Sequence, residues 1–217
     1  AGDLCSTITK GATPAAQTRD AGEVPFLKVY NITKHGDVDF TYQPTFIPRA
    51  VHEGELRRSR VRAGDVLMNI VGPPLGKVAV VPDELVDANI NQAIAVYRPT
   101  NVTGDYLALC LSAEHLFTWA LSRAKRTSTQ LNLTLEICRD YPIPLPASDE
   151  RDTIMRLLKN IHGRTHAESL ANRQLRVLKT ALMSVLLTGE LRVDVTRTEC
   201  PVLQADCSGR MSRATPR

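Results

Sequence analysis

The chain lacks the features that mark several large classes of protein. Its five cysteines include no CxxC pair, so the sequence indicates neither a zinc ribbon nor a redox motif. No apolar run approaches the roughly 18–20 residues of a membrane-spanning helix, and no signal peptide opens the sequence. With 43% hydrophobic residues the chain is too apolar for general disorder. We therefore expect a folded cytoplasmic protein with reduced cysteines, of which Cys110 and Cys138 are predicted to be buried.

A large excess of basic charge is absent as well. The formal net charge is only +4. Residues 1–150 carry 15 Lys and Arg against 17 Asp and Glu, whereas residues 151–217 carry 12 against 6. This distribution excludes a uniformly basic coat of the histone type, so any binding of nucleic acid must depend on local clusters.

Apolar and β-branched runs predict a β-rich first part of the chain. We expect a strand over residues 24–32 that forms a hairpin with residues 38–42, and further strands over residues 68–71, 77–81 and 93–99. Helical spacing of apolar residues then predicts one helix, or two short ones, over residues 104–125. A polar loop, a short amphipathic turn and an extended, proline-rich segment follow.

The sequence changes character at Ser148. Residues 148–190 contain no proline, with Ser148 or Asp149 as a possible N-cap and Gly189 as a C-terminal stop. About 40 residues at about 1.5 Å each give a rod of about 60 Å, which needs a second long helix to cover its apolar stripe. The stripe follows heptad spacing, with apolar ends and a polar middle, and its helix-pairing residues are Leu157, Ile161, Leu175, Leu178, Leu182 and Val185. We therefore predict an α+β fold with a mixed, β-rich domain over 1–147, a long coiled-coil helix over 148–190 and a disordered tail over 191–217.

Two segments invite a catalytic or metal-binding interpretation but lack the required residues. In the stretch from Gly64 to Pro82, GPPLGKV has the wrong spacing for a phosphate-binding loop, and valine replaces the hydroxyl that would bind Mg²⁺. A rigid hairpin between two core strands is the simpler interpretation, and Lys77 contacting a nucleic-acid phosphate is the alternative.

His162 and His166 lie four residues apart, but HGRTH lacks the glutamate of HExxH. We expect no catalytic residue and no metal site in this chain.

Two clusters of basic residues are the best candidates for binding. A solvated charged face is the ordinary explanation for each cluster alone. However, guanidinium groups beside hydroxyl and amide side chains are also what recognition of duplex DNA requires. The first cluster is Arg57, Arg58, Arg60 and Arg62, and the second is Arg123, Lys125 and Arg126, followed by Thr127, Ser128, Thr129 and Gln130. A polar loop adds the amides of Asn89, Asn91 and Gln92, which could equally cap strand ends.

Eight segments in a fixed order are more specific than any single one. They are GDLCSTITKGATP, VPFLKVYNI, RAGDVLMNIVGPPLGKVAVVP, NINQAIAVYRP, YLALCLSA, RTSTQLNL, ICRDYPIPLP and ERDTIMRLL. Together they resemble the specificity subunit of type I restriction–modification systems. The resemblance covers one target recognition domain, about residues 1–147, and the conserved helix that follows it.

The resemblance implies a non-catalytic protein that binds double-stranded DNA. Members of this family carry two recognition domains, each for one half of a split target, held apart by two long antiparallel helices. The helices also dock modification subunits, which methylate adenine, and a restriction subunit with motor and nuclease activities completes the enzyme. S-adenosylmethionine, ATP and Mg belong to those partner subunits, and no cofactor is expected in this chain. Base-contacting positions vary among members, so the resemblance assigns none of them here.

The chain also departs from the family pattern. It has one recognition domain, so it is either the C-terminal half of a subunit or a half-sized version that pairs with a second copy. Glu150-Arg151 stands where the family often has Glu-Gln. The family's Gly-Ser-Thr-Gln-like loop is replaced by Thr127-Ser128-Thr129-Gln130, which Arg126 precedes. Since no initiator Met opens the sequence, a longer reading frame is expected.

Two other functions remain open at this stage. The chain could be the recognition domain of a single-chain restriction–methyltransferase enzyme, or a coiled-coil interaction protein without a DNA role. If the DNA-binding interpretation holds, Lys77→Ala should weaken binding at all sequences alike, whereas substitution of Arg126 or Gln130 should relax specificity.

Overall fold

The computed structural model describes residues 1–15, 22–85, 87–126 and 130–192, which form parts of two compact units, Ala1–Leu158 and Lys159–Arg217. The boundary falls inside helix α5 (Ser148–Thr188). The first turns of this helix belong to the first unit, since Met155 packs against the core of that unit. Gly189 follows α5 at φ +77°, the left-handed conformation that a terminating glycine adopts. Most of the predicted tail lies outside the described residues, and none of the described helices has the length and apolarity to span a membrane.

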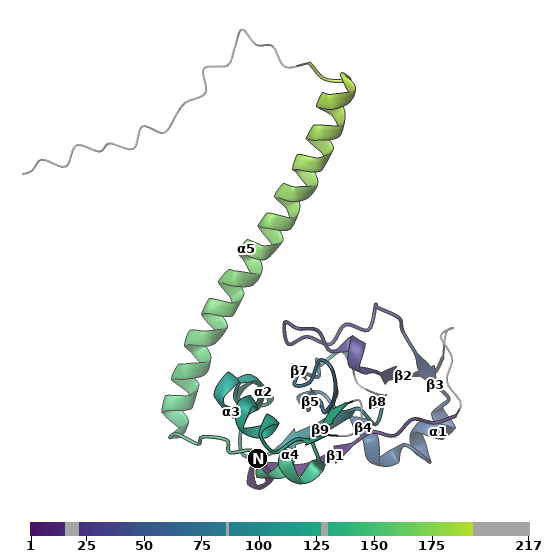
Figure 1. Cartoon of the computed structure of the whole chain (residues 1–217), viewed down its shortest axis with the longest axis vertical. Helices are drawn as coiled ribbons and strands as arrows, with labels where there is room; N and C mark the ends of the chain where they lie inside the picture. The colour runs from purple at the N-terminus through teal and green to yellow at the C-terminus, as the bar shows by residue number, and fades with distance from the viewer. Residues whose placement is uncertain (16–21, 86, 127–129, 193–217) are drawn as a thin grey trace, which may run out of the picture. The chain divides into compact units, whose positions relative to one another are not determined.

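The first unit is built around an antiparallel sheet whose two central strands are buried on both faces (Figure 1). Its strand order is β1 (Cys5–Lys10), β9 (Ile94–Pro99), β5 (Val66–Asn69) and β7 (Val78–Val80). Ala95 and Tyr97 of β9 face one core and Ile94 and Val96 face another. This two-sided burial explains why β5 and β9 appear in the sequence as largely apolar runs, whereas the partly exposed edge strand β1 contains polar residues.

Three short helices cover one face of the central sheet. They are α2 (Gly104–Ser112), α3 (Glu114–Leu121) and α4 (Leu135–Asp140). Thr103 and Thr134 cap α2 and α4 by accepting hydrogen bonds from the backbone N–H three residues on. Ala113 is in the extended conformation and separates α2 from α3, so the predicted helical region is two helices.

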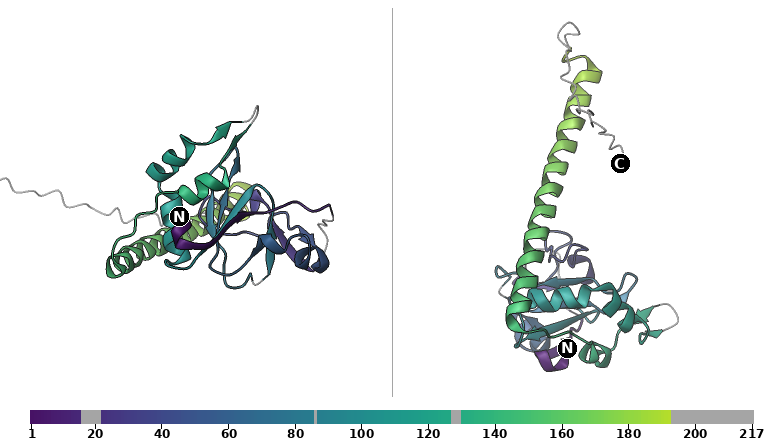
Figure 2. Two further views of the ribbon diagram at one scale, coloured as in Figure 1. Left: turned by 90° about the horizontal axis from the view of Figure 1, so that it is seen from below. Right: turned by 90° about the vertical axis from the view of Figure 1, so that its left-hand side faces the viewer.

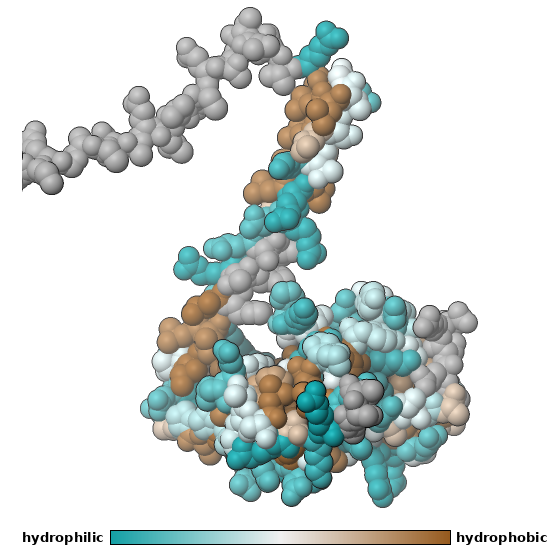
Figure 3. Space-filling model, in the orientation of Figure 1, coloured by the Kyte–Doolittle hydropathy of each residue, from teal (hydrophilic) through white to brown (hydrophobic). Residues whose placement is uncertain are grey.

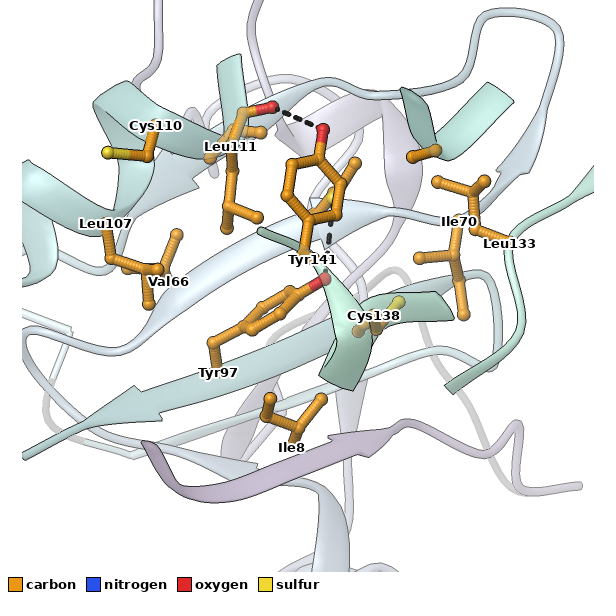
Figure 4. Close-up of a cluster of buried hydrophobic side chains, with 14 of the residues drawn as sticks. Ile8, Val66, Ile70, Tyr97, Leu107, Cys110, Leu111, Leu133, Cys138 and Tyr141 are labelled. Carbon is orange, nitrogen blue, oxygen red and sulfur yellow. Dashed lines mark hydrogen bonds between the residues drawn. The ribbon is translucent and has the colours of Figure 1, made fainter. Parts of the chain in front are cut away.

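The core between these helices and the sheet is apolar, with its few polar atoms paired (Figure 4). The Tyr141 hydroxyl donates to the Leu111 carbonyl over 3.1 Å, and the Tyr97 hydroxyl lies 3.6 Å from the Met68 sulfur. Cys110 and Cys138 are buried free thiols, as predicted. Burial raises the pKa of both thiols.

A second sheet covers the other face of the central sheet. Its order is β3 (Phe46–Ile47), β2 (Val24–Leu27), β8 (Ala88–Ile90) and β4 (Arg60–Val61), with β2 and β8 parallel. Leu27, Val61 and Ile90 pack toward the central sheet. On its far side, Phe26 and Leu56 pack with Val51 of α1 (Arg49–Glu53).

A third, small sheet joins segments that are far apart in the sequence. β6 (Val71–Gly72) pairs with β11 (Leu131–Asn132), which pairs in turn with β10 (Lys125–Arg126). β6 lies in the turn between β5 and β7, within the Gly64–Pro82 stretch. The stretch is therefore a hairpin of two core strands, as predicted, and its turn also supports the polar segment around Lys125.

The predicted strands over 24–32 and 38–42 are wrong in their extent. β2 ends at Leu27, residues Val29–Asn31 form a 3₁₀ turn, and only the Ile32–Val38 bridge remains of the predicted hairpin. Polar side chains take the place of strand partners for the backbone here. Asn31 Nδ2 donates to the carbonyls of Asp39 and Tyr42, and the Asp39 carboxylate accepts from the Thr41 N–H. Side chains of this kind compete with regular backbone ladders.

Candidate nucleic-acid interface

The β10–β11 hairpin presents basic side chains at the edge of the first unit. Lys125 and Arg126 are exposed, and neither side chain makes a hydrogen bond or ion pair with the described residues. In both views of Figure 2 the two green strands extend outward on either side of a thin grey stretch. That stretch contains the candidates Thr127, Ser128 and Thr129, which lie outside the described residues. Gln130, on the β11 side, is exposed.

The turn beneath this hairpin is held in one shape by Asn69 and Gly72. Asn69 Nδ2 donates to the carbonyls of Val71 at 3.2 Å and Pro74 at 2.7 Å. A Cβ on Gly72 would lie 2.4 Å from the Pro74 carbonyl oxygen, so only glycine fits there. β6 belongs to this turn and pairs with β11, so the turn fixes the position of one strand of the basic hairpin.

Arg123 precedes the hairpin and has a fixed orientation. Its guanidinium lies 4.2 Å from the centre of the Trp119 ring and donates to the Trp119 carbonyl at 3.2 Å. The cation–π contact and the hydrogen bond keep this charge at the C-terminal end of α3, where a helix dipole favours a cation.

The other basic cluster belongs to the second sheet. Arg57 and Arg58 lie on a 3₁₀ turn (Arg57–Ser59), Arg60 is in β4, and Arg62 follows it. The side chains of Arg57, Arg58 and Arg62 are exposed and form no hydrogen bond or ion pair with any part of the chain that the structure describes. The two clusters are thus on different sheets, and each is carried by a short element at a sheet edge.

A polar network fixes the backbone below the first cluster. Asp65 is 2% exposed and accepts hydrogen bonds from Arg98 Nη2 at 2.6 Å and Nε at 2.9 Å. It also accepts from the Arg62 backbone N–H at 2.8 Å, while Arg98 Nη2 donates to the Arg60 carbonyl at 3.1 Å. The ion pair between Arg98 and the buried Asp65 carboxylate therefore helps to fix the position of residues 60–62.

The amides of the predicted polar loop have separate positions. Asn89 is in β8 instead of a loop and is fully buried. Asn91 caps a turn, because its Oδ1 accepts from the Ala93 N–H at 3.3 Å. Gln92 is exposed, and its Oε1 accepts a hydrogen bond from the Thr13 hydroxyl.

The apolar stripe of α5 is exposed. Leu157, Ile161, Leu175, Leu178 and Leu182 are 46–61% accessible, and Val185 is half-buried. In Figure 3 brown side chains gather toward the two ends of the helix. Arg164 and Glu168, in the middle of the stripe, are exposed as well, and the side chains of His162 and His166 lie outside the described residues. Among the described residues no three His, Cys, Asp or Glu side chains form a group that could bind a metal ion.

A family model for the type I restriction modification DNA specificity domain matches residues 1–175, which include the central sheet, both basic clusters and more than half of α5. The chain belongs to this family. The resemblance stated from the ordered motifs is therefore confirmed.

Individual relatives agree with this assignment. The specificity subunit of the type I restriction enzyme EcoBI from Escherichia coli is 26% identical over 135 residues, covering 61% of this chain and 28% of that protein. The crystal structure of the HsdS subunit from Thermoanaerobacter tengcongensis has a TM-score of 0.53 at 18% identity, covering 85% of this chain and 47% of that one. A chain from a study of complex assembly and conformational transition of the type I R-M system has a TM-score of 0.59 at 20% identity, covering 85% and 43%. The chain thus spans less than half the length of these relatives.

Within this DNA specificity domain, sequence reasoning found the exposed cations but missed the buried groups that position them. His52, Asp65 and Arg98 were not singled out, although each contacts the segment 60–62. Asp65 and Arg98 lie within two of the ordered segments, but neither segment indicates their role, which depends on pairing between strands that are distant in the sequence. An acidic residue directly before an apolar run, such as Asp65 before Val66–Met68 of β5, is the one available signal.

Lys77 was predicted as a phosphate contact or a framework residue, and its contacts favour the framework. Nζ donates to the carbonyls of Val29 at 2.8 Å and Ile32 at 2.7 Å, which ties β7 to the 3₁₀ turn. Desolvation, and to a lesser extent the nearby Lys34, lowers the pKa of Lys77.

We expect Lys77→Ala to lower the free energy of unfolding by about 1–2 kcal/mol, because two carbonyls lose a charged donor. Urea unfolding measures this change. The slope of log affinity for DNA against log salt should stay unchanged. A slope reduced by about one would show instead that Nζ neutralises a phosphate.

Proposed function

We propose that this chain is a non-catalytic, sequence-specific DNA-binding module of a type I restriction–modification complex. Residues 1–147 would bind one half of a bipartite target, and residues 148–190 would act as the spacer that holds this half at a set distance from the other. The observation that carries the proposal is the family match over residues 1–175, together with exposed basic side chains on a hairpin that the core supports.

The chemistry of the two clusters suits a duplex. Arginine and lysine neutralise phosphates, and a planar guanidinium can also pair with the O6 and N7 acceptors of guanine in the major groove. Exposed cations that have no partner among the described residues, such as Lys125 and Arg126, need not break a contact with that part of the chain to bind DNA. A near-neutral domain with local clusters also avoids the indiscriminate binding that a uniformly basic surface gives.

The exposed faces of α5 suit two kinds of partner. The heptad stripe fits a second long helix, either from another recognition domain or from a second copy of this chain. Val177, Met183 and Leu187 are also exposed, and they lie at least about 100° around the helix axis from Leu178 and Leu182. One partner helix cannot cover both faces, so the second face is available to a modification subunit. In that assembly S-adenosylmethionine, ATP and Mg would be bound by the modification and restriction subunits.

The proposal is tested by selecting duplexes from a randomised pool with the purified chain. We expect enrichment of one short half-site, or of two copies with a fixed spacing if the chain pairs with itself. Methylome sequencing of the source cell, with and without the gene, gives a second readout, since the same motif should lose adenine methylation. Weak binding with no enriched sequence would contradict the proposal.

Arg126→Ala should relax specificity at one base pair of the half-site. If Arg126 makes a bidentate base contact, discrimination at that position falls by about 1–3 kcal/mol. Titration of duplexes that differ at single base pairs measures this loss. Arg123→Ala is the matched control, because the Arg123 guanidinium already contacts the Trp119 ring. If Arg126→Ala instead weakens binding equally at every position, Arg126 contacts the DNA backbone and not a base.

A further inference from the structure

One arginine of the first basic cluster is oriented by a fully buried histidine. His52 lies on α1 and is 0% exposed. Arg60 Nε donates a hydrogen bond to His52 Nε2 over 2.8 Å, and on the other side of the ring Nδ1 contacts Asn89 Oδ1. Both ring nitrogens are therefore satisfied inside the protein, and one of their partners is a residue of the candidate interface.

The surrounding hydrogen bonds define the protonation of this histidine. Asn89 Nδ2 donates to the Leu56 carbonyl at 2.8 Å and to the Ser59 hydroxyl at 3.2 Å, so Asn89 Oδ1 must be an acceptor. His52 Nδ1 then carries the hydrogen, and Nε2 is the acceptor that Arg60 requires. Asp87 Oδ1 lies 3.7 Å from Nε2, which is too far for a hydrogen bond, and the Asp87 carboxylate also faces Arg49 at 3.6 Å. The imidazole is thus neutral, in a single tautomer.

Arg60 differs in this respect from its neighbours. It is half-buried, and no carboxylate oxygen of the described residues lies within 4.0 Å of its guanidinium. Only Nε is used, so Nη1 and Nη2 make no hydrogen bond within the described part of the chain. The nearby Arg58 is exposed and has no such support. A guanidinium held by its Nε loses less conformational entropy on binding than a free one does.

We propose that Arg60 makes an oriented, two-point contact with DNA through Nη1 and Nη2, and that His52 is the positioning residue for this contact. The inference rests on the proposed function, since it names one contact of the same surface. The ligand chemistry is a pair of acceptors that match the planar fork. Guanine O6 with N7, or two phosphate oxygens, can supply this pair.

The experiment uses the full chain and a randomised pool of duplexes, followed by titration of the selected duplex and its single-base variants. Arg60→Lys keeps the charge but removes the fork, and we expect it to weaken binding about tenfold. His52→Leu should cause the same loss, and the double variant should lose no more than Arg60→Lys alone. His52→Gln, whose amide oxygen can accept from Arg60, should restore most of the affinity. Arg49→Lys, at an exposed arginine outside both basic clusters, is the matched control and should bind like the unmodified chain.

The outcomes separate the inference from the proposed function. A loss confined to one base pair assigns the acceptors to a guanine edge, and an equal loss at all sequences assigns them to phosphate; both support the inference. If the unmodified chain enriches a sequence but His52→Leu binds as well as it does, with only its thermal stability reduced, the positioning role is refuted. If the unmodified chain enriches no sequence, the proposed function fails first. Should His52→Leu not fold, His52→Asn replaces it, because the shorter amide reaches Asn89 but falls short of Arg60.

Discussion

If the chain pairs with a second copy through α5, replacing Leu178 and Leu182 by aspartate should convert the purified dimer into a monomer. The two leucines lie one turn apart on the exposed stripe of α5, at 54% and 46% exposure. In a paired helix they would be buried, and two carboxylates per copy would then have to leave water without partners. If two recognition domains bind DNA together, loss of pairing also removes the gain from linking them, so affinity for a two-part site should fall at least about a hundredfold. Analytical ultracentrifugation measures the first effect and DNA titration the second.

The control for this variant adds the same charge to another face of the helix. Thr180→Asp with Ser184→Asp places two carboxylates about one turn apart on exposed positions away from Leu178 and Leu182. This control should remain a dimer and keep its affinity for DNA. A monomeric unmodified chain at micromolar concentration would show that the stripe does not serve self-pairing, and would favour a partner helix from a different recognition domain.

The parts of the fold that follow from local sequence were predictable. Apolar runs predicted β5, β7 and β9 of the central sheet, and the change at Ser148 predicted the start of α5, whereas β1, with its polar sequence CSTITK, was not predicted. What the sequence could not show is pairing across long separations, such as β6 with β11 or β2 with β8. The segment 24–42 was misjudged for a different reason. Its apolar residues favour strands, but Asn31 and Asp39 capture backbone groups and end the strand early.

The candidate DNA-binding surface was likewise predictable from the sequence only in part. Exposed cations are visible in a sequence as clusters, so Arg57, Arg58, Lys125 and Arg126 were identified. The groups that fix a cation are buried single residues whose partners come from other strands, and composition gives no signal for them. Arg60 and Arg58 look alike in the sequence, and only the contact with His52 distinguishes them. Residues that position a contact therefore need the structure, whereas residues that make it can be proposed from the chain alone.

Asp65→Ala should cause the largest loss of stability among these variants. The carboxylate is 2% exposed and accepts both the two-point pair from Arg98 and the Arg62 backbone N–H. Removing it leaves a guanidinium that is only partly exposed without a counter-charge, which typically costs about 3–5 kcal/mol. Urea unfolding followed by circular dichroism measures the loss. Arg49→Ala is the matched control, because it breaks an ion pair with Asp87 in which both side chains are about half exposed, and it should cost less than about 1 kcal/mol.

The double variant Asp65→Ala with Arg98→Ala decides whether the pair acts as a unit. With both charges removed no buried charge is left unpaired, so the double variant should be more stable than Asp65→Ala alone. The Arg60 carbonyl and the Arg62 N–H still lose their partners, however, so the segment that carries the first basic cluster stays loosened. We therefore expect the double variant to recover stability without recovering full affinity for DNA. Recovery of both would mean that the Asp65–Arg98 pair serves only the fold, and that residues 60–62 hold their position without it.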